Sequence, residues 1–206
     1  MPDGIRPLSR RDAAAAARLH CGGIRTGFLS TLGEGFLRQL YAAIPSCQSG
    51  FGFIWMGPNG SPLGFVACAE GTGRLYRQVL LRRGLLMALA LARHAVHPKT
   101  LKRLWETLRY PSVAGSGLPP AEVLSIAVAE GARGRGGGTA LMGAALDEFR
   151  RRGVNRVKVA VGADNAAAGC FYERCGFHLA ARRQHHGQPM NIYVVALSGT
   201  AAPGPP

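Results

Sequence analysis

The spacing of apolar residues along the chain predicts strands and helices in a mixed order. Short apolar runs bounded by turn residues predict strands at 5–8, 51–56, 63–69 and 121–128. Val157, Val159 and Val161 share one face and predict a half-buried strand over 156–161, and a hairpin is expected at 177–183 and 191–197. Apolar positions three and four residues apart predict helices at 9–19, 33–44, 137–152 and 165–175.

Composition indicates one globular domain. Of the 206 residues, 47% are hydrophobic and 17% are charged, which suits a chain that buries a core. We expect the domain to span residues 1–200, with a loose tail at 201–206. The five cysteines are an odd number without ligand spacing, which argues against a zinc site and favours a reducing, cytoplasmic setting. The N-terminus is polar, unlike a signal peptide, and no apolar run is long enough to span a membrane.

The segment from Val128 to Leu141 carries the clearest chemical signal. An apolar strand leads into a turn crowded with glycines, and an amphipathic helix leaves it. Such a turn presents unpaired N–H groups at a helix N-terminus, where the helix dipole also favours an anion. Glycine lets a phosphate oxygen approach the backbone, and Arg133 and Arg135 add positive charge. The segment therefore predicts a phosphate-binding turn.

Other nucleotide and nucleic-acid motifs fit this turn less well. A nucleoside-triphosphate loop ends in Gly-Lys-Ser/Thr, whereas this turn ends in Gly-Thr-Ala. A dinucleotide fingerprint needs Gly or Ala where this chain has Thr139 or Leu141. An Arg/Gly tract that binds RNA belongs in a polar tail and not between two patterned elements, so we expect no nucleic-acid binding here.

The pattern that does fit is Arg-x-x-Gly-x-Gly, formed by Arg133, Gly136 and Gly138, which resembles the acetyl-CoA pyrophosphate loop of the GNAT superfamily of N-acyltransferases. Residues 165–177 also match the superfamily pattern Asn-x-x-Ala-x-x-x-Tyr-x-x-x-Gly-Phe. The resemblance implies an α/β (α+β) fold, with a mixed, mostly antiparallel central sheet flanked by helices, and acetyl-CoA as co-substrate without a metal. The coenzyme-binding residues that it implies are Ile126, Ala127, Val128, Arg133, Gly134, Arg135, Gly136, Gly137, Gly138, Thr139, Asn165, Ala168 and Tyr172.

The residues of the second motif also have purely structural interpretations. Asn165 is a good helix N-cap, and Gly176 is suited to end that helix in a left-handed turn. An isolated Tyr172 would be a core aromatic. The resemblance instead implies that Asn165 lies near the pantetheine arm and that the Tyr172 hydroxyl faces the coenzyme sulfur. A phenol with a pKa near ~10 can protonate the departing thiolate.

The residue that takes the proton of the acceptor amine is less clearly marked. Glu122 opens the strand before the turn, where histone acetyltransferases of the superfamily carry a catalytic glutamate, so the resemblance makes it the candidate base. The alternative is a solvated glutamate that follows two prolines. Weaker candidates are Ser125, His185 and His186. Some peptide N-terminal acetyltransferases carry a glutamate in the next strand, where this chain has Ala160, which counts against a protein N-terminus as acceptor.

The chain departs from the compact superfamily pattern in a helical insertion at 71–120, with helical stretches predicted at 74–96 and 98–110. From Arg74 to Tyr110 the only acid is Glu106, and Gly84 to Ala92 is nearly uncharged. This combination fits an interfacial helix on an anionic membrane, a lid over the acceptor groove, or a homodimer interface. The net charge of +14 also favours anionic partners, among them coenzyme A itself. The expected location is cytoplasmic, with peripheral contact at the inner membrane face as one alternative.

The resemblance implies acetyl transfer from acetyl-CoA to a primary amine by direct attack. An amino sugar, or a precursor of envelope polysaccharide or glycolipid, is the first acceptor class, and a small-molecule or antibiotic amine is the second. A non-catalytic protein that binds coenzyme A or lipid is the alternative from another class. The early helices usually wall the acceptor site in the superfamily, so His20, Arg25 and Tyr41 are candidates to meet the acceptor, although each also fits a packing or surface role.

Overall fold

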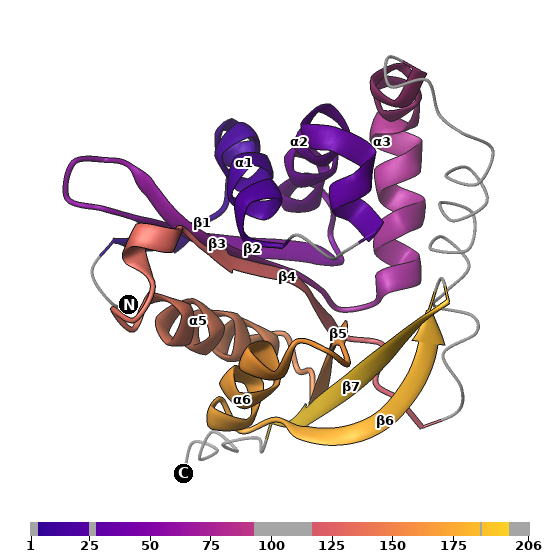
Figure 1. The fold of residues 1–206 in the computed structure, drawn as a ribbon. Coiled ribbons are helices and arrows are strands. Elements are labelled where there is room, and N and C mark those ends of the chain that lie inside the picture. Colours follow the sequence, from indigo (N-terminus) through magenta and orange to yellow (C-terminus); the bar gives the residue numbers. More distant parts are fainter. Residues whose placement is uncertain (1–3, 25–27, 93–116, 186, 198–206) are drawn as a thin grey trace, which may run out of the picture.

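The computed structural model describes residues 4–24, 28–92, 117–185 and 187–197. Within these ranges one seven-stranded sheet has the order β1-β2-β3-β4-β5-β7-β6 (Figure 1). The strands are β1 (Ile5–Pro7), β2 (Gly50–Met56), β3 (Pro62–Ala69), β4 (Glu122–Val128), β5 (Arg156–Gly162), β6 (His178–His185) and β7 (Gln188–Ala196). Neighbouring strands are antiparallel except β4 and β5, which are parallel. The predicted mixed, mostly antiparallel sheet is thus confirmed.

Helices cover both faces of this sheet (Figure 1). One face carries α1 (Ala13–Gly23), α2 (Gly33–Ala43) and α3 (Thr72–Ala92), and the other carries α5 (Gly137–Arg151) and α6 (Ala166–Arg174). Short 3-10 turns precede or follow these elements, namely η1 (Arg10–Asp12), η2 (Phe28–Leu32), η3 (Ile44–Ser46) and η4 (Glu130–Ala132). The two-sided cover explains why β3 is apolar at successive positions, because both of its faces are buried.

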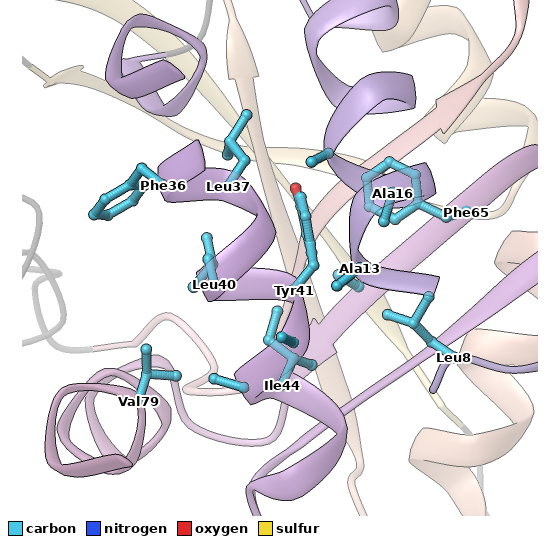
Figure 2. Close-up of a cluster of buried hydrophobic side chains, with 14 of the residues drawn as sticks. Leu8, Ala13, Ala16, Phe36, Leu37, Leu40, Tyr41, Ile44, Phe65 and Val79 are labelled. Carbon is cyan, nitrogen blue, oxygen red and sulfur yellow. The ribbon is translucent and has the colours of Figure 1, made fainter. Parts of the chain in front are cut away.

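Alternate residues of β3 serve the two cores. Phe65 and Ala67 face the core beneath α1 and α2, whereas Val66 and Cys68 face the core beneath α5. In the first core the ring of Tyr41 meets Phe65 edge-to-face with centroids 4.9 Å apart (Figure 2). The sheet therefore separates two apolar layers, and each layer fixes one group of helices.

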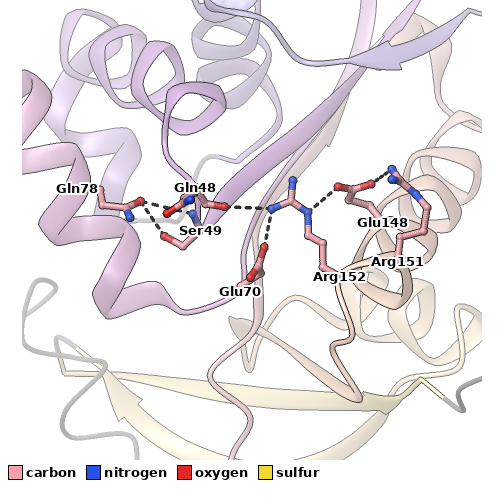
Figure 3. A network of polar contacts seen from close by, with 7 residues as sticks. All are labelled: Gln48, Ser49, Glu70, Gln78, Glu148, Arg151 and Arg152. Carbon is pink, nitrogen blue, oxygen red and sulfur yellow. Dashed lines mark hydrogen bonds and ion pairs between the residues drawn. The ribbon is translucent and has the colours of Figure 1, made fainter.

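Arg152, just past the end of α5, links this helix to the loops before β2 and after β3 (Figure 3). Its guanidinium bonds Glu148 Oε1 and Glu70 Oε1, each at 2.5 Å, and donates to the backbone oxygen of Gln48 at 3.2 Å. It also lies over the Phe51 ring, 4.5 Å from the centroid. This network ties the last turn of α5 to the loop that leaves β3, which a periodicity argument does not reveal.

Several boundaries differ from the expectations. The first helix begins with the 3-10 turn η1, capped by Ser9 and Asp12, and α1 then runs beyond the predicted end to Gly23. The terminal hairpin is longer than predicted, because β6 and β7 continue to pair with each other as far as His185 and Gln188. The helical stretch expected at 74–96 corresponds to α3 as far as Ala92. Residues 93–96, the stretch expected at 98–110 and the tail at 201–206 lie outside the described residues.

Candidate coenzyme and acceptor site

The parallel pair of β4 and β5 forms a fork. Its register contains two pairs, Glu122 with Lys158 and Val123 with Val159, and stops there. Strand β5 continues to pair with β7 as far as Gly162, while β4 continues to pair with β3 as far as Val128. The predicted coenzyme residues Ile126, Ala127 and Val128 lie in the part of β4 that has left β5. Their backbone groups on that side are not used by the described sheet, so an extended ligand could hydrogen-bond them.

The glycine-rich turn connects the open end of β4 to the N-terminus of α5. Gly134 and Gly136 have φ values of +75° and +77°, and a Cβ at either position would meet nothing within 4 Å. Gly136 caps α5, and Ala140 makes the first bond to its carbonyl, so the N–H groups of the first turn remain available. Arg133 donates from Nε to the carbonyl of Val128 at 3.4 Å, and its side chain, like that of Arg135, is exposed. The turn thus combines positive charge, free space and helix-end donors, which suits a pyrophosphate.

Two further glycines of this turn are held close to other elements. A Cβ on Gly137 would come 2.2 Å from Cζ3 of the Trp55 ring on β2. A Cβ on Gly138 would lie 3.5 Å from Phe171 Cε2 and 3.7 Å from Val128 Cγ2. The N-terminus of α5 therefore touches both the open end of β4 and helix α6, and the two sequence motifs, far apart along the chain, lie side by side.

Helix α6 carries the second motif. The Asn165 side chain caps it by accepting from the Ala168 N–H at 3.1 Å, which confirms the capping interpretation. Tyr172 is buried with Phe177 and Tyr193, at centroid distances of 5.9 Å and 6.1 Å. Burial raises the pKa of Tyr172 to about 12, so the phenol is neutral at physiological pH and remains a hydrogen-bond donor.

Glu122 is buried at the closed end of the fork and is not the solvated residue of the alternative interpretation. Its Oε2 accepts from the Thr72 hydroxyl at 2.8 Å, and Lys158 Nζ lies 3.6 Å away. Lys158 also donates to the carbonyl of Pro119 at 2.9 Å. Burial raises the pKa of the Glu122 carboxyl, and Lys158 and Thr72 oppose this increase. The sequence argument missed both partners, although the register of a parallel pair places Lys158 opposite Glu122.

His20 and Tyr41 are buried in the core between α1 and α2, where packing was one of the expected roles. His20 Nδ1 lies 2.5 Å from the Tyr41 oxygen, and Nε2 lies 3.1 Å from the Ser30 oxygen. Because Ser30 donates to the Ile24 carbonyl, it accepts from Nε2, which leaves Nδ1 to accept from the phenol. Burial lowers the pKa of His20 to about 4, in keeping with this neutral ring. Burial strongly raises the pKa of Tyr41, and a hydrogen bond from Ser125 on β4 lowers it in part.

The other candidates are placed less fully. Ala160 lies on β5 just beyond its last pair with β4, on the branch of the fork opposite β4. Arg25, His186 and the side chain of His185 lie outside the described part of the chain. Among the described residues no group of three or more His, Cys, Asp or Glu side chains is arranged to hold a metal. In the same ranges no helix has the length and apolar character needed to cross a bilayer.

Comparison with known proteins gives a consistent family. The profile described as Acetyltransferase (GNAT) family matches residues 24–177. The mycothiol acetyltransferase of Beutenbergia cavernae is 44% identical over 68 residues, which are 33% of this chain and only 23% of that protein.

Solved structures share the fold over nearly the whole chain. The ribosomal-protein-S18-alanine N-acetyltransferase of Escherichia coli has a TM-score of 0.60 at 18% identity, over 98% of this chain and 97% of its own. The structure of SsHAT has a TM-score of 0.69 at 20% identity, over 94% and 98% of the two chains. At such identities the likeness concerns the fold alone.

Proposed function

The chain belongs to the GNAT acetyltransferase family and is an acyltransferase, and we propose that it moves the acetyl group of acetyl-CoA to a primary amine. Enzymes of this family use acetyl-CoA as co-substrate. The observation that carries the proposal is the fork of β4 and β5, which opens beside the glycine-capped N-terminus of α5. An elongated thioester with a polyanionic end fits a site that has strand-edge donors at one end and a helix N-terminus at the other.

The first task of the site is to bind the coenzyme. The first-turn N–H groups of α5, with Arg133 and Arg135 nearby, hold the pyrophosphate in this proposal. The backbone of β4 between Ile126 and Val128 pairs with the pantetheine arm. A backbone N–H of this stretch also stabilises the negative charge that grows on the thioester oxygen as the amine attacks.

The second task is to let the sulfur leave. The amine nitrogen forms a bond to the acetyl carbon, the carbon–sulfur bond breaks, and the sulfur gains the electron pair. Tyr172 donates a hydrogen bond to that sulfur in this proposal. A coenzyme thiol, with a pKa near ~8.5 like that of cysteine, is a stronger acid than a phenol whose pKa is about 12. Tyr172 therefore acts mainly as a hydrogen-bond donor that stabilises the sulfur as it leaves as a thiolate, and the proton lost by the amine balances the charge of that thiolate.

The third task is to remove the proton from the amine. We propose Glu122 for this step, acting directly or through water. Its burial raises the pKa of the carboxyl and makes it a stronger base, and the contacts with Lys158 and Thr72 oppose this increase in part. The pH dependence of kcat/KM tests whether Glu122 acts as this base.

For the acceptor we propose an amino sugar or an amine-bearing envelope precursor, with other small amines as the second class. The match to a mycothiol acetyltransferase supports a small molecule over a protein. Ala160 supports the same choice, since no carboxylate occupies that position of β5.

The proposal is tested by calorimetric titration with acetyl-CoA, followed by a thiol-release screen over amino sugars, polyamines, small antibiotic amines and peptides. We expect micromolar binding and turnover on one of the small-amine classes. Binding without turnover on any class would support the non-catalytic alternative, and turnover restricted to peptides would overturn the acceptor assignment. A lack of binding would overturn the coenzyme site itself.

A further inference from the structure

Helix α3 is apolar on two opposite sides. Its inner stripe is formed by Leu75, Val79, Met87 and Leu91, spaced by multiples of four. All four are buried in the core on this side of the sheet, where the helix packs against α2. Arg83, in the same row, donates to Gln39 Oε1 on α2 at 2.8 Å. These contacts account for the attachment of the helix to the domain. Within the described part of the chain, the residues on its opposite side are exposed.

That opposite side is a row of exposed leucines. Leu81, Leu85 and Leu89 follow one another at four-residue intervals, with 83%, 76% and 55% of each residue exposed. They are offset by two positions from the inner stripe, which is about 200° around a helix at 3.6 residues per turn. Leu80 and Leu86, beside them, are 43% and 45% exposed. A surface helix normally presents charged or polar residues here, so a continuous apolar row marks an interaction surface.

The charged residues of helix α3 all have one sign. Arg74, Arg77 and Arg82 are exposed on the same helix, and no acidic residue occurs between Thr72 and Ala92. A second copy of the chain docked through this row by twofold symmetry would bring the arginines of both copies together without acids on the helix to pair with them. An anionic lipid surface complements both features, because it accepts leucines below the headgroups and arginines at their level.

We propose that the outer face of α3, defined by Leu81, Leu85 and Leu89 with Arg74, Arg77 and Arg82, docks on the surface of an anionic membrane. The helix lies flat on the bilayer and does not cross it. Its inner stripe keeps it attached to α2, so docking needs no unfolding of the domain. The proposal does not depend on the catalytic assignments.

The test is co-sedimentation of the full chain with vesicles of phosphatidylcholine alone or with phosphatidylglycerol. We expect binding that requires phosphatidylglycerol and weakens as salt rises. The double variant Leu81→Ser/Leu85→Ser should lower the partition coefficient by roughly tenfold or more, since both leucines leave water on docking. Arg77→Glu should lower it by roughly fivefold or more through charge.

Two matched variants on β6 serve as controls. Leu179, 40% exposed, is changed to Ser, and the exposed Arg182 is changed to Glu. Both should bind like the unchanged chain. Equal losses in the control and α3 variants would show a diffuse attraction between a basic protein and an acidic surface, and would overturn the proposal. An absence of binding to phosphatidylglycerol vesicles would also overturn the proposal. The same holds if the protein sediments as a dimer without vesicles and Leu81→Ser/Leu85→Ser converts it to a monomer.

Discussion

Gly137 lies directly against the indole ring of Trp55, so close that a Cβ on the glycine would come within 2.2 Å of ring carbon Cζ3. The contact joins the first residue of α5 to the end of β2, next to the edge of the sheet, and limits where the N-terminus of the helix can lie. The same N-terminus is the proposed pyrophosphate site. A requirement for glycine here therefore has a cause apart from the direct approach of a phosphate.

The substitution Gly137→Ala should weaken acetyl-CoA binding by roughly tenfold, because the added methyl must displace the indole or the helix end at a cost of about 1–3 kcal/mol. Titration calorimetry measures the effect. Gly131→Ala, in the same turn but with nothing within 4 Å of its Cβ position and no positive φ, is the matched control and should bind normally. Trp55→Leu in the Gly137→Ala background should restore part of the affinity. If Gly131→Ala weakens binding equally, the Trp55 contact is not the cause.

The substitution Tyr172→Phe should lower kcat by roughly a hundredfold and leave the Kd for acetyl-CoA almost unchanged. The reason is that Phe keeps the packing against Phe177 and Tyr193 and removes only the donor. Steady-state rates and calorimetry on the same preparation separate the two effects. An unchanged kcat would exclude a role for the phenol at the sulfur.

The Glu122 assignment is tested through the pH dependence of the rate. A base must be ionised, so kcat/KM should rise with pH through the pKa of Glu122, which burial holds above its ordinary value. Glu122→Gln should remove this rise. Lys158→Met should move it to higher pH, because it removes a charge that lowers the pKa of Glu122. A residue that serves only the sheet would lower thermal stability in both variants and leave the shape of the pH profile intact.

The neutral His20 ring predicts a loss of stability in acid. Burial lowers its pKa from 6.5 to about 4. Between pH 6.5 and pH 4 this residue is therefore protonated in the unfolded chain and neutral in the folded chain. The free energy of unfolding is not reduced by this group above the pKa of His20 in the unfolded chain. It should fall by about 3 kcal/mol as the pH drops to about 4, with no further loss from His20 at lower pH. Urea unfolding at pH 7 and pH 4.5 measures this. His20→Gln should remove most of the pH dependence, and an unchanged slope would place its origin in other groups.

The local sequence pattern predicted most of the fold and the elements that carry the candidate site. The two motifs located the turn before α5 and the helix α6 because each needs particular residues at fixed spacing, and the Asn165 cap follows from one residue type. The fork could not be predicted from the sequence. It depends on where the pairing of β4 with β5 stops and on a register shift between β3 and β4 near Ala67. Non-local register has no signature in either strand alone.

The placement of His20 could have been found. In α1 it shares a face with Ala13, Ala16 and Ala17, and that spacing marks the buried side of the helix. The superfamily made it a candidate to meet the acceptor, beside the packing role that its burial shows. The Glu122–Lys158 contact illustrates the opposite case, since it requires both the parallel register and the burial of that end of the sheet.

The hydrogen bond from Thr72 to Glu122 joins the first residue of α3 to the first residue of β4. A displacement of α3 can therefore be transmitted to β4, whose other end lies in the proposed coenzyme site. If the lipid surface changes the position of that strand, thermodynamic linkage requires the effect to be mutual. If vesicles change the affinity of the protein for acetyl-CoA by some factor, acetyl-CoA must change its affinity for the vesicles by the same factor. The buried contact between Thr72 and Glu122 can thus couple membrane binding to coenzyme binding.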